Sequence, residues 1–149
     1  TPFPSSYELF YPVVAGKIPG DRFYKLKLLK EWFTGKLIFN SIRKTDYHLI
    51  LSKKRLVEAE NQILKNKDFS QVNDSLTKSI EEIKTAIEIS KRAKESGEQV
   101  QDVLNTIKTV GTNEADFIEK TLLQSTPENQ KEYLIKSSQT IRTLIKEID

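Results

Sequence analysis

Apolar side chains recur every three to four residues from position 22 to the end of the chain, which is the period of an amphipathic helix. The pattern is interrupted near residues 35, 66–68, 97 and 125–127, where Gly, Asn, Asp or Pro occurs. We therefore predict an all-α fold, an elongated antiparallel bundle of four to five helices with an extended N-terminal arm. The predicted helices span residues 22–34, 37–65, 71–110, 112–123 and 127–148.

The first predicted helix is defined by the residues at its two ends. Pro19 and Gly20 favour a tight turn, after which Asp21 is placed to cap the helix. Gly35 is expected to end or kink it. Large apolar residues occupy so many of its positions that we expect this helix to be largely buried.

Later helix ends are predicted in the same way. Ser70 is placed to cap the third helix. Gly97 marks either a phase shift in one long helix or a break between two stacked helices. Gly111 is typical of the residue that follows a helix, and Pro127 of the first position of the last helix.

The N-terminal arm, residues 1–20, is rich in proline and aromatic residues. It holds four of the five prolines of the chain, which disfavour helix. Its aromatic residues predict that it packs against something, either its own bundle or a neighbouring subunit. The proposed contact residues are Phe3, Tyr7, Phe10 and Tyr11.

Two separated motifs carry a resemblance to a known family. The first is IPGDRFYKLK at residues 18–27, and the second is RLVEA at residues 55–59. In this order they resemble a bacterial family of unknown function that opens with Leu-Pro-Gly-Asp/Ser-x-x-Tyr-x-Leu-Lys and carries Arg-Leu-x-Glu-Ala in its second helix. The resemblance covers roughly residues 8–95, and it implies an exported, envelope-facing helical domain without established chemistry.

The motif residues themselves suggest structural roles. The ring of Tyr24 can pack while its hydroxyl reaches a polar partner. Arg55 can pair with Glu58, three residues on, or reach Asp21 or Glu31 on the first helix. The full set of motif residues is Pro19, Gly20, Asp21, Tyr24, Leu26, Lys27, Arg55 and Glu58.

The chain divides into three predicted regions: the arm at 1–20, a family-like helical region at 21–111, and a C-terminal helical hairpin at 112–149. Charge is divided between the two halves of the chain. Residues 1–67 hold 13 basic and 6 acidic side chains, and the remainder of the totals, 24 basic and 21 acidic, leaves 11 and 15 for residues 68–149. This asymmetry fits either two helical layers that attract each other or a basic face toward an anionic partner.

The absence of Cys fits an exported protein, and the absence of Met suggests a start at a processed site, behind a signal peptide or membrane anchor. No catalytic, cofactor-binding or metal-binding motif is found. His48 is the only histidine, so a metal site or catalytic triad would have to be built around it. Basic residues alternate with aromatic residues in the first half, but helix packing accounts for those aromatics, and we do not expect nucleic-acid binding.

These observations predict a non-enzymatic structural or protein-interaction module of a bacterial cell envelope, located outside the cytoplasm. The expected partner is a protein, including a second copy of the chain in a homo-oligomer, filament or lattice joined through the arm. The alternative is an envelope-associated ligand-binding or lipid-binding helical protein. No cofactor is expected.

Overall fold

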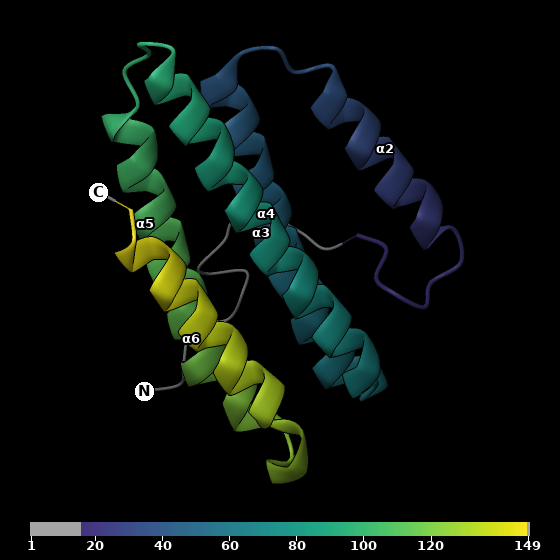
Figure 1. The fold of residues 1–149 in the computed structure, drawn as a ribbon. Helices are drawn as coiled ribbons and strands as arrows, with labels where there is room; N and C mark the ends of the chain where they lie inside the picture. The colour runs from purple at the N-terminus through teal and green to yellow at the C-terminus, as the bar shows by residue number, and fades with distance from the viewer. Residues whose placement is uncertain (1–15, 149) are drawn as a thin grey trace.

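The computed structural model describes residues 16–148, except for the side chain of Asn66. Within these residues the protein is all-helical and elongated, as predicted (Figure 1). Five α-helices lie within the described residues: α2 (Tyr24–Lys36), α3 (Ser41–Asn61), α4 (Phe69–Glu95), α5 (Gln101–Phe117) and α6 (Glu132–Lys146). The arm residues Phe3, Tyr7, Phe10 and Tyr11 lie outside the described residues.

Helices α3 and α4 form an antiparallel pair, and α5 and α6 form a second pair that packs against it (Figure 1). The core lies between the two pairs because each helix contributes an apolar stripe at helical spacing. Its largest fully buried apolar side chains are Leu56, Leu76, Ile83, Ile107, Phe117, Ile118, Leu122, Leu134 and Ile141.

The α3–α4 connection is tighter than the sequence predicts. Helix α3 begins at Ser41 rather than at residue 37, because the Asn40 side chain accepts the Arg43 N–H at 3.0 Å and caps the helix. It continues into a π-turn, Gln62–Asn66, that closes at Lys67 in a left-handed conformation. Asp68, and not Ser70, caps α4 by accepting the Gln71 N–H at 3.3 Å.

Gly97 separates two helices, which decides between the two predicted arrangements. Its φ of 85° is left-handed, and the Glu98 N–H donates to Ala93 O at 3.0 Å. This is the bond pattern that commonly closes a helix on a glycine. Gly111 was predicted to follow a helix, but that prediction is wrong: it lies inside α5, where a close approach to Ile145 requires a residue without a Cβ. The predicted region boundary at 111 therefore falls within a helix.

The start of the last helix is also displaced from its prediction. Pro127 has extended backbone and Glu128–Gln130 form a 3-10 turn, so α6 begins only at Glu132. The Thr126 hydroxyl donates to Leu122 O at 2.7 Å and is therefore not available to cap a helix. The apolar seam of α6 is as expected, with Leu134 and Ile141 fully buried.

Helix α2 lies beside the bundle rather than within it (Figure 1). The prediction that it is largely buried is wrong. Its buried residues are Tyr24, Glu31 and Gly35, of which two are polar and one has no side chain. The helix also runs past Gly35, whose missing Cβ lets α2 approach the Tyr47 ring of α3.

Candidate functional site

The loop before α2 is closed by hydrogen bonds within a turn and is held to the end of α3 by the Gln62 side chain. The predicted turn is present: the Asp21 N–H donates to Ile18 O at 3.0 Å, with Gly20 at a φ of 96°. The Asp21 carboxylate does not cap α2 as predicted, because it accepts the Ile18 N–H at 2.8 Å instead. The Gln62 amide donates to Pro19 O at 2.5 Å, so this turn is held against the π-turn that follows α3.

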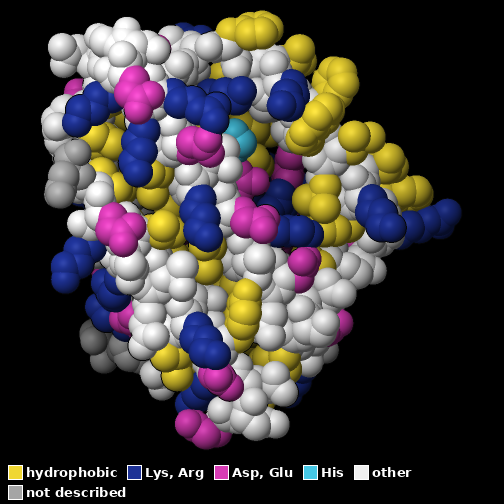
Figure 2. All heavy atoms as spheres, in the orientation of Figure 1, with side chains coloured by type: hydrophobic (Ala, Val, Ile, Leu, Met, Phe, Trp, Pro, Cys, Tyr) yellow, Lys and Arg dark blue, Asp and Glu magenta, His cyan; other side chains and the backbone are white. Residues whose placement is uncertain are grey.

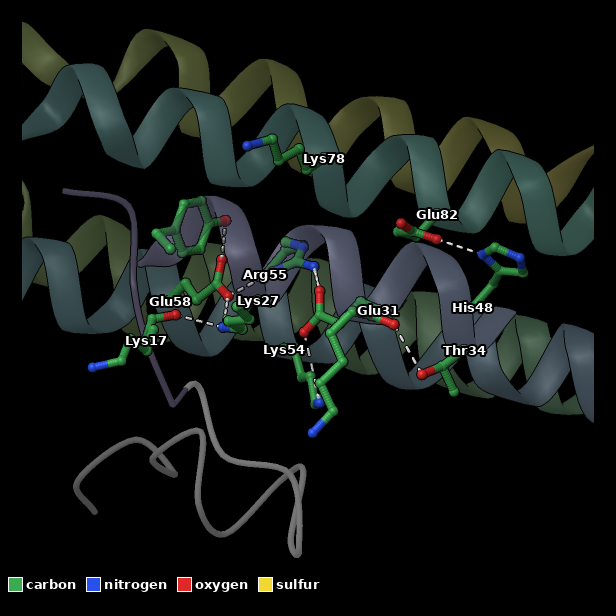
Figure 3. A network of polar contacts seen from close by, with 12 residues as sticks. Lys17, Lys27, Glu31, Thr34, His48, Lys54, Arg55, Glu58, Lys78 and Glu82 are labelled. Atoms are coloured by element: carbon green, nitrogen blue, oxygen red, sulfur yellow. Dashed lines mark hydrogen bonds and ion pairs between the residues drawn. The ribbon is translucent and has the colours of Figure 1, made fainter. Parts of the chain in front are cut away.

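Helix α2 contacts α3 through its polar face. Tyr24, Lys27 and Glu31 are spaced three and four residues apart and therefore share one face of the helix. Figure 3 shows the side chains of Lys27 and Glu31 directed at Glu58 and Arg55 on α3. The Tyr24 hydroxyl donates to Glu58 Oε2 at 3.0 Å, while Lys27 donates to Glu58 Oε1.

Arg55 connects the two carboxylates of this network. Its Nη1 donates to Glu58 Oε1 at 2.6 Å and its Nη2 donates to Glu31 Oε2. Glu31 Oε1 accepts no hydrogen bond but lies 3.7 Å from Lys54 Nζ. Of the three partners that the sequence suggested for Arg55, Glu58 and Glu31 are engaged at once. The third, Asp21, accepts the Ile18 N–H instead.

The network is buried, with Arg55 at 3% exposure and Glu58 at 0%. Burial, followed by the charge of Glu58, raises the pKa of the Tyr24 hydroxyl and keeps it a donor. Burial acts to lower the pKa of Arg55, but Glu58 and Glu31 outweigh it and raise that pKa above its usual value. Buried charges are tolerated when they are paired and hydrogen-bonded, so these groups hold α2 in one orientation.

Because its polar face is turned inward, α2 presents its apolar residues to solvent. Leu26, Leu29, Trp32 and Phe33 are 57–58% exposed. We call this surface the outer face of α2; it consists of Phe23, Leu26, Leu29, Trp32, Phe33 and Leu37. Figure 2 shows hydrophobic side chains gathered over this helix.

Basic side chains border the outer face (Figure 2). Lys25, Lys30 and Lys36 are exposed along α2, and Arg22 precedes it. Arg22 and Lys36 lie over the rings of Phe23 and Trp32, at 4.8 and 5.6 Å from the ring centroids. Large exposed apolar patches on proteins mark interaction sites. Here the apolar outer face of α2 is bordered by positively charged side chains.

A cavity of about 440 Å³ lies behind α2, between α2, α3 and α4. Trp32, Leu51 and Ile89 contribute apolar surface to its lining, which also includes Arg55. His48 Nδ1 lies 2.6 Å from Glu82 Oε2 on the wall formed by α3 and α4. Figure 2 shows the surface hollowed beside this histidine.

The cavity lining limits the chemistry that this site can perform. The His48–Glu82 pair could move a proton, but the lining contains no Ser, Cys or Asp, and its hydroxyls are those of Tyr47 and Thr85. The Tyr47 hydroxyl is already bonded to Glu31 O at 2.8 Å. Among residues 16–148, no group of three or more His, Asp or Glu side chains is arranged to hold a metal ion. None of the helices in that range has the length and apolarity to cross a membrane.

The profile of one protein family matches residues 16–114, which is more than half of the chain. The chain belongs to the DUF5667 family. That family is described only as a domain of unknown function. The DUF5667 match extends past residue 95, where the resemblance inferred from the motifs ends, and it includes α5 almost to its last turn. No curated protein and no solved structure is significantly similar to this chain.

The structure brings together most of the motif residues identified in the sequence. Tyr24, Lys27, Arg55 and Glu58 form the buried network, and the Pro19–Gly20–Asp21 turn anchors the loop that leads to it. Leu26 takes no part, since it lies on the outer face.

Sequence reasoning missed a second buried polar cluster, between α3, α4 and α5. Ser52 Oγ lies 2.9 Å from Glu114 Oε2 and 3.0 Å from Ser79 O. Burial raises the pKa of Glu114 to about 8, against a smaller lowering by Ser52. Ser52 has one hydroxyl hydrogen, so a protonated Glu114 that donates to Ser52 lets Ser52 donate onward to Ser79. In the sequence Glu114 resembles any surface glutamate, because its burial follows from helix packing.

Proposed function

We propose that this DUF5667 protein is a non-enzymatic interaction module and that it binds its partner through the outer face of α2. The observation that carries the proposal is the orientation of α2. A buried network of Tyr24, Glu31, Arg55 and Glu58 fixes the polar face of the helix inward, so its apolar face is held in solvent.

The energetics of the outer face support this proposal. Each large apolar side chain contributes about 1.5–3 kcal/mol when it is fully buried. Six such residues remain exposed here while charged groups are buried instead. Exposed apolar side chains of this kind are expected where a binding partner buries them and so provides the stabilisation that the isolated chain lacks.

The location that we propose is outside the cytoplasm, in a bacterial cell envelope. The support for it is the motif resemblance to exported domains and the absence of Cys. Fractionation of cells that produce the natural full-length protein, followed by detection in the cytoplasmic and envelope fractions, tests it. Recovery only from the cytoplasm would contradict the location and leave the interaction surface untouched.

The interaction surface is tested by retention on isolated envelopes. We expect the full chain to sediment with envelopes of the cells that make it and the double variant L29Q/F33Q to remain in the supernatant. The matched control is L64Q/I135Q, which replaces two apolar residues that are exposed away from α2. Equal retention of the three proteins would overturn the proposal, provided that circular dichroism finds the same helix content in each.

The cavity favours a second candidate function, the binding of a small amphiphilic ligand. Its volume of about 440 Å³ suits such a molecule, and apolar walls lie beside Arg55, Lys44 and Arg92. Native mass spectrometry of the purified chain is expected to detect a bound species that is lost in I89W, where a larger side chain fills the space. A spectrum of the bare chain alone, before and after incubation with a lipid extract, would reject this candidate.

A further inference from the structure

We infer that the partner of the outer face of α2 is the surface of an anionic lipid bilayer, on which α2 lies parallel to the membrane plane. This inference rests on the proposed function, because it names the partner of the same surface. It is carried by charge and by the chemistry of the exposed side chains.

The charge around the outer face selects an anionic partner. Lys25, Lys30 and Lys36 are exposed on α2 itself, with no carboxylate on that helix other than the buried Glu31. Between residues 16 and 44 the other acidic residue is Asp21, whose side chain is occupied by the Ile18 N–H. Basic residues near an anionic membrane surface each strengthen binding about fivefold, and the effect declines as salt is added.

A second copy of the chain fits this surface poorly. Contact between two outer faces would bring two sets of lysines together, and like charges repel. Within residues 16–148, the large exposed apolar side chains away from α2 and its flanks are Ile42, Ile50, Leu64 and Ile135. Ile42 and Ile50, at 37% and 39% exposure, are two turns apart on α3, and the other two are on the π-turn and on α6. That part of the chain therefore offers no second apolar patch to receive α2.

The composition of the outer face suits the boundary between lipid headgroups and acyl chains. Helices that lie in this boundary combine Leu, Phe and Trp on one face with Lys or Arg beside them. Lysine side chains there extend their ammonium groups toward water while their methylene stems lie on apolar surface. The exposed apolar surface continues past α2 to Phe39, which is 90% exposed.

Trp32 provides a direct readout, because it is the only tryptophan of the chain and lies on the outer face. The experiment mixes the full chain with vesicles of phosphatidylcholine alone and of phosphatidylcholine with an equal amount of phosphatidylglycerol. We expect co-sedimentation and a blue shift of Trp32 emission with the anionic vesicles only. We expect L29Q/F33Q to lose both signals, K25Q/K30Q/K36Q to bind about fivefold more weakly for each lysine replaced, and L64Q/I135Q to match the wild type.

The outcomes separate this inference from the proposed function. Absence of vesicle binding, combined with envelope retention that protease treatment of the envelopes abolishes, identifies a protein partner and overturns the lipid inference alone. Concentration-dependent self-association that L29Q/F33Q removes overturns it in the same way. Vesicle binding with unchanged Trp32 emission overturns it as well, because another surface is then bound. Equal behaviour of wild type and L29Q/F33Q on both vesicles and envelopes overturns both proposals.

Discussion

Arg55 Nη1 lies 2.6 Å from Glu58 Oε1, and neither side chain is open to solvent. The two residues are three apart on α3, a spacing at which exposed pairs contribute only about 0.5 kcal/mol. Here the pair is buried under α2 and shared with Tyr24, Lys27 and Glu31. It therefore decides how α2 is oriented and which face of that helix meets solvent.

Replacing Arg55 is expected to destabilise the protein strongly. In R55A two buried carboxylates lose their shared cation, and breaking a buried pair from one side costs about 3–5 kcal/mol. Urea denaturation followed by circular dichroism measures the change. The control R92A removes an exposed i,i+4 partner of Glu88 and is expected to stay within about 0.5 kcal/mol of the wild type. Similar losses in the two variants would mean that the network does not stabilise the fold.

The hydroxyl of Tyr24 is expected to contribute separately from its ring. In Y24F the ring is kept but Glu58 Oε2 loses a donor at 3.0 Å, which costs about 1–3 kcal/mol for a buried acceptor. Thermal unfolding of the two proteins gives the difference. The variant Y47F serves as a comparison, because the Tyr47 hydroxyl donates to a backbone carbonyl of α2 in a less buried position. If Y24F unfolds at the wild-type temperature, the Tyr24–Glu58 bond does not fasten α2.

Glu114 is expected to make stability fall as pH rises. Its pKa is about 8 in the folded chain and 4.5 in the reference state, so between these values the folded chain holds a proton that the unfolded chain releases. The contribution of Glu114 to the free energy of unfolding is therefore fully present below pH 4.5. It decreases by about 1.4 kcal/mol per pH unit as the pH rises from 4.5 to about 8.

The variant E114Q tests this sign, because glutamine can donate to Ser52 at every pH. We expect E114Q to be more stable than the wild type at pH 8 and to lack this fall between about pH 5 and 8 in urea denaturation, a range that lies between the reference pKa of 4.5 and the folded-state pKa of about 8. E88Q, at an exposed position of α4, serves as the control for removing a carboxylate. Parallel stability profiles for E114Q and the wild type would show that Glu114 is ionised in the folded chain.

Gly111 is expected to be required for the α5–α6 contact. A Cβ at this position would lie 2.4 Å from Ile145 Cγ2, so G111A forces the helices apart and costs about 1–3 kcal/mol, less the gain in helix propensity. The cost is expected to shrink when Ile145 is already alanine. A double-mutant cycle of G111A and I145A measures this coupling, and an additive result would contradict the close approach.

The sequence by itself determined the helical class and much of the helix register. A local pattern predicts the structure correctly where a residue type has a single structural role. Leu134 and Ile141 face the core at helical spacing, as predicted. Pro19 and Gly20 form the predicted turn. Glycine was ambiguous. Gly97 ends a helix because it adopts a left-handed φ. Gly111 lies within a helix, at a position where Ile145, 34 residues later in the chain, leaves no room for a Cβ.

Only the tertiary structure decided which face of α2 is buried. Apolar content predicted a buried helix, and periodicity could not reveal that Tyr24, Lys27 and Glu31 would meet Arg55 and Glu58 across two helices. Once these charged groups are buried, water cannot replace their hydrogen bonds and ion pairs. The orientation of α2 that keeps these contacts is therefore the favoured one. The exposed Leu, Phe and Trp side chains follow from that constraint, which exists only when both helices are in place.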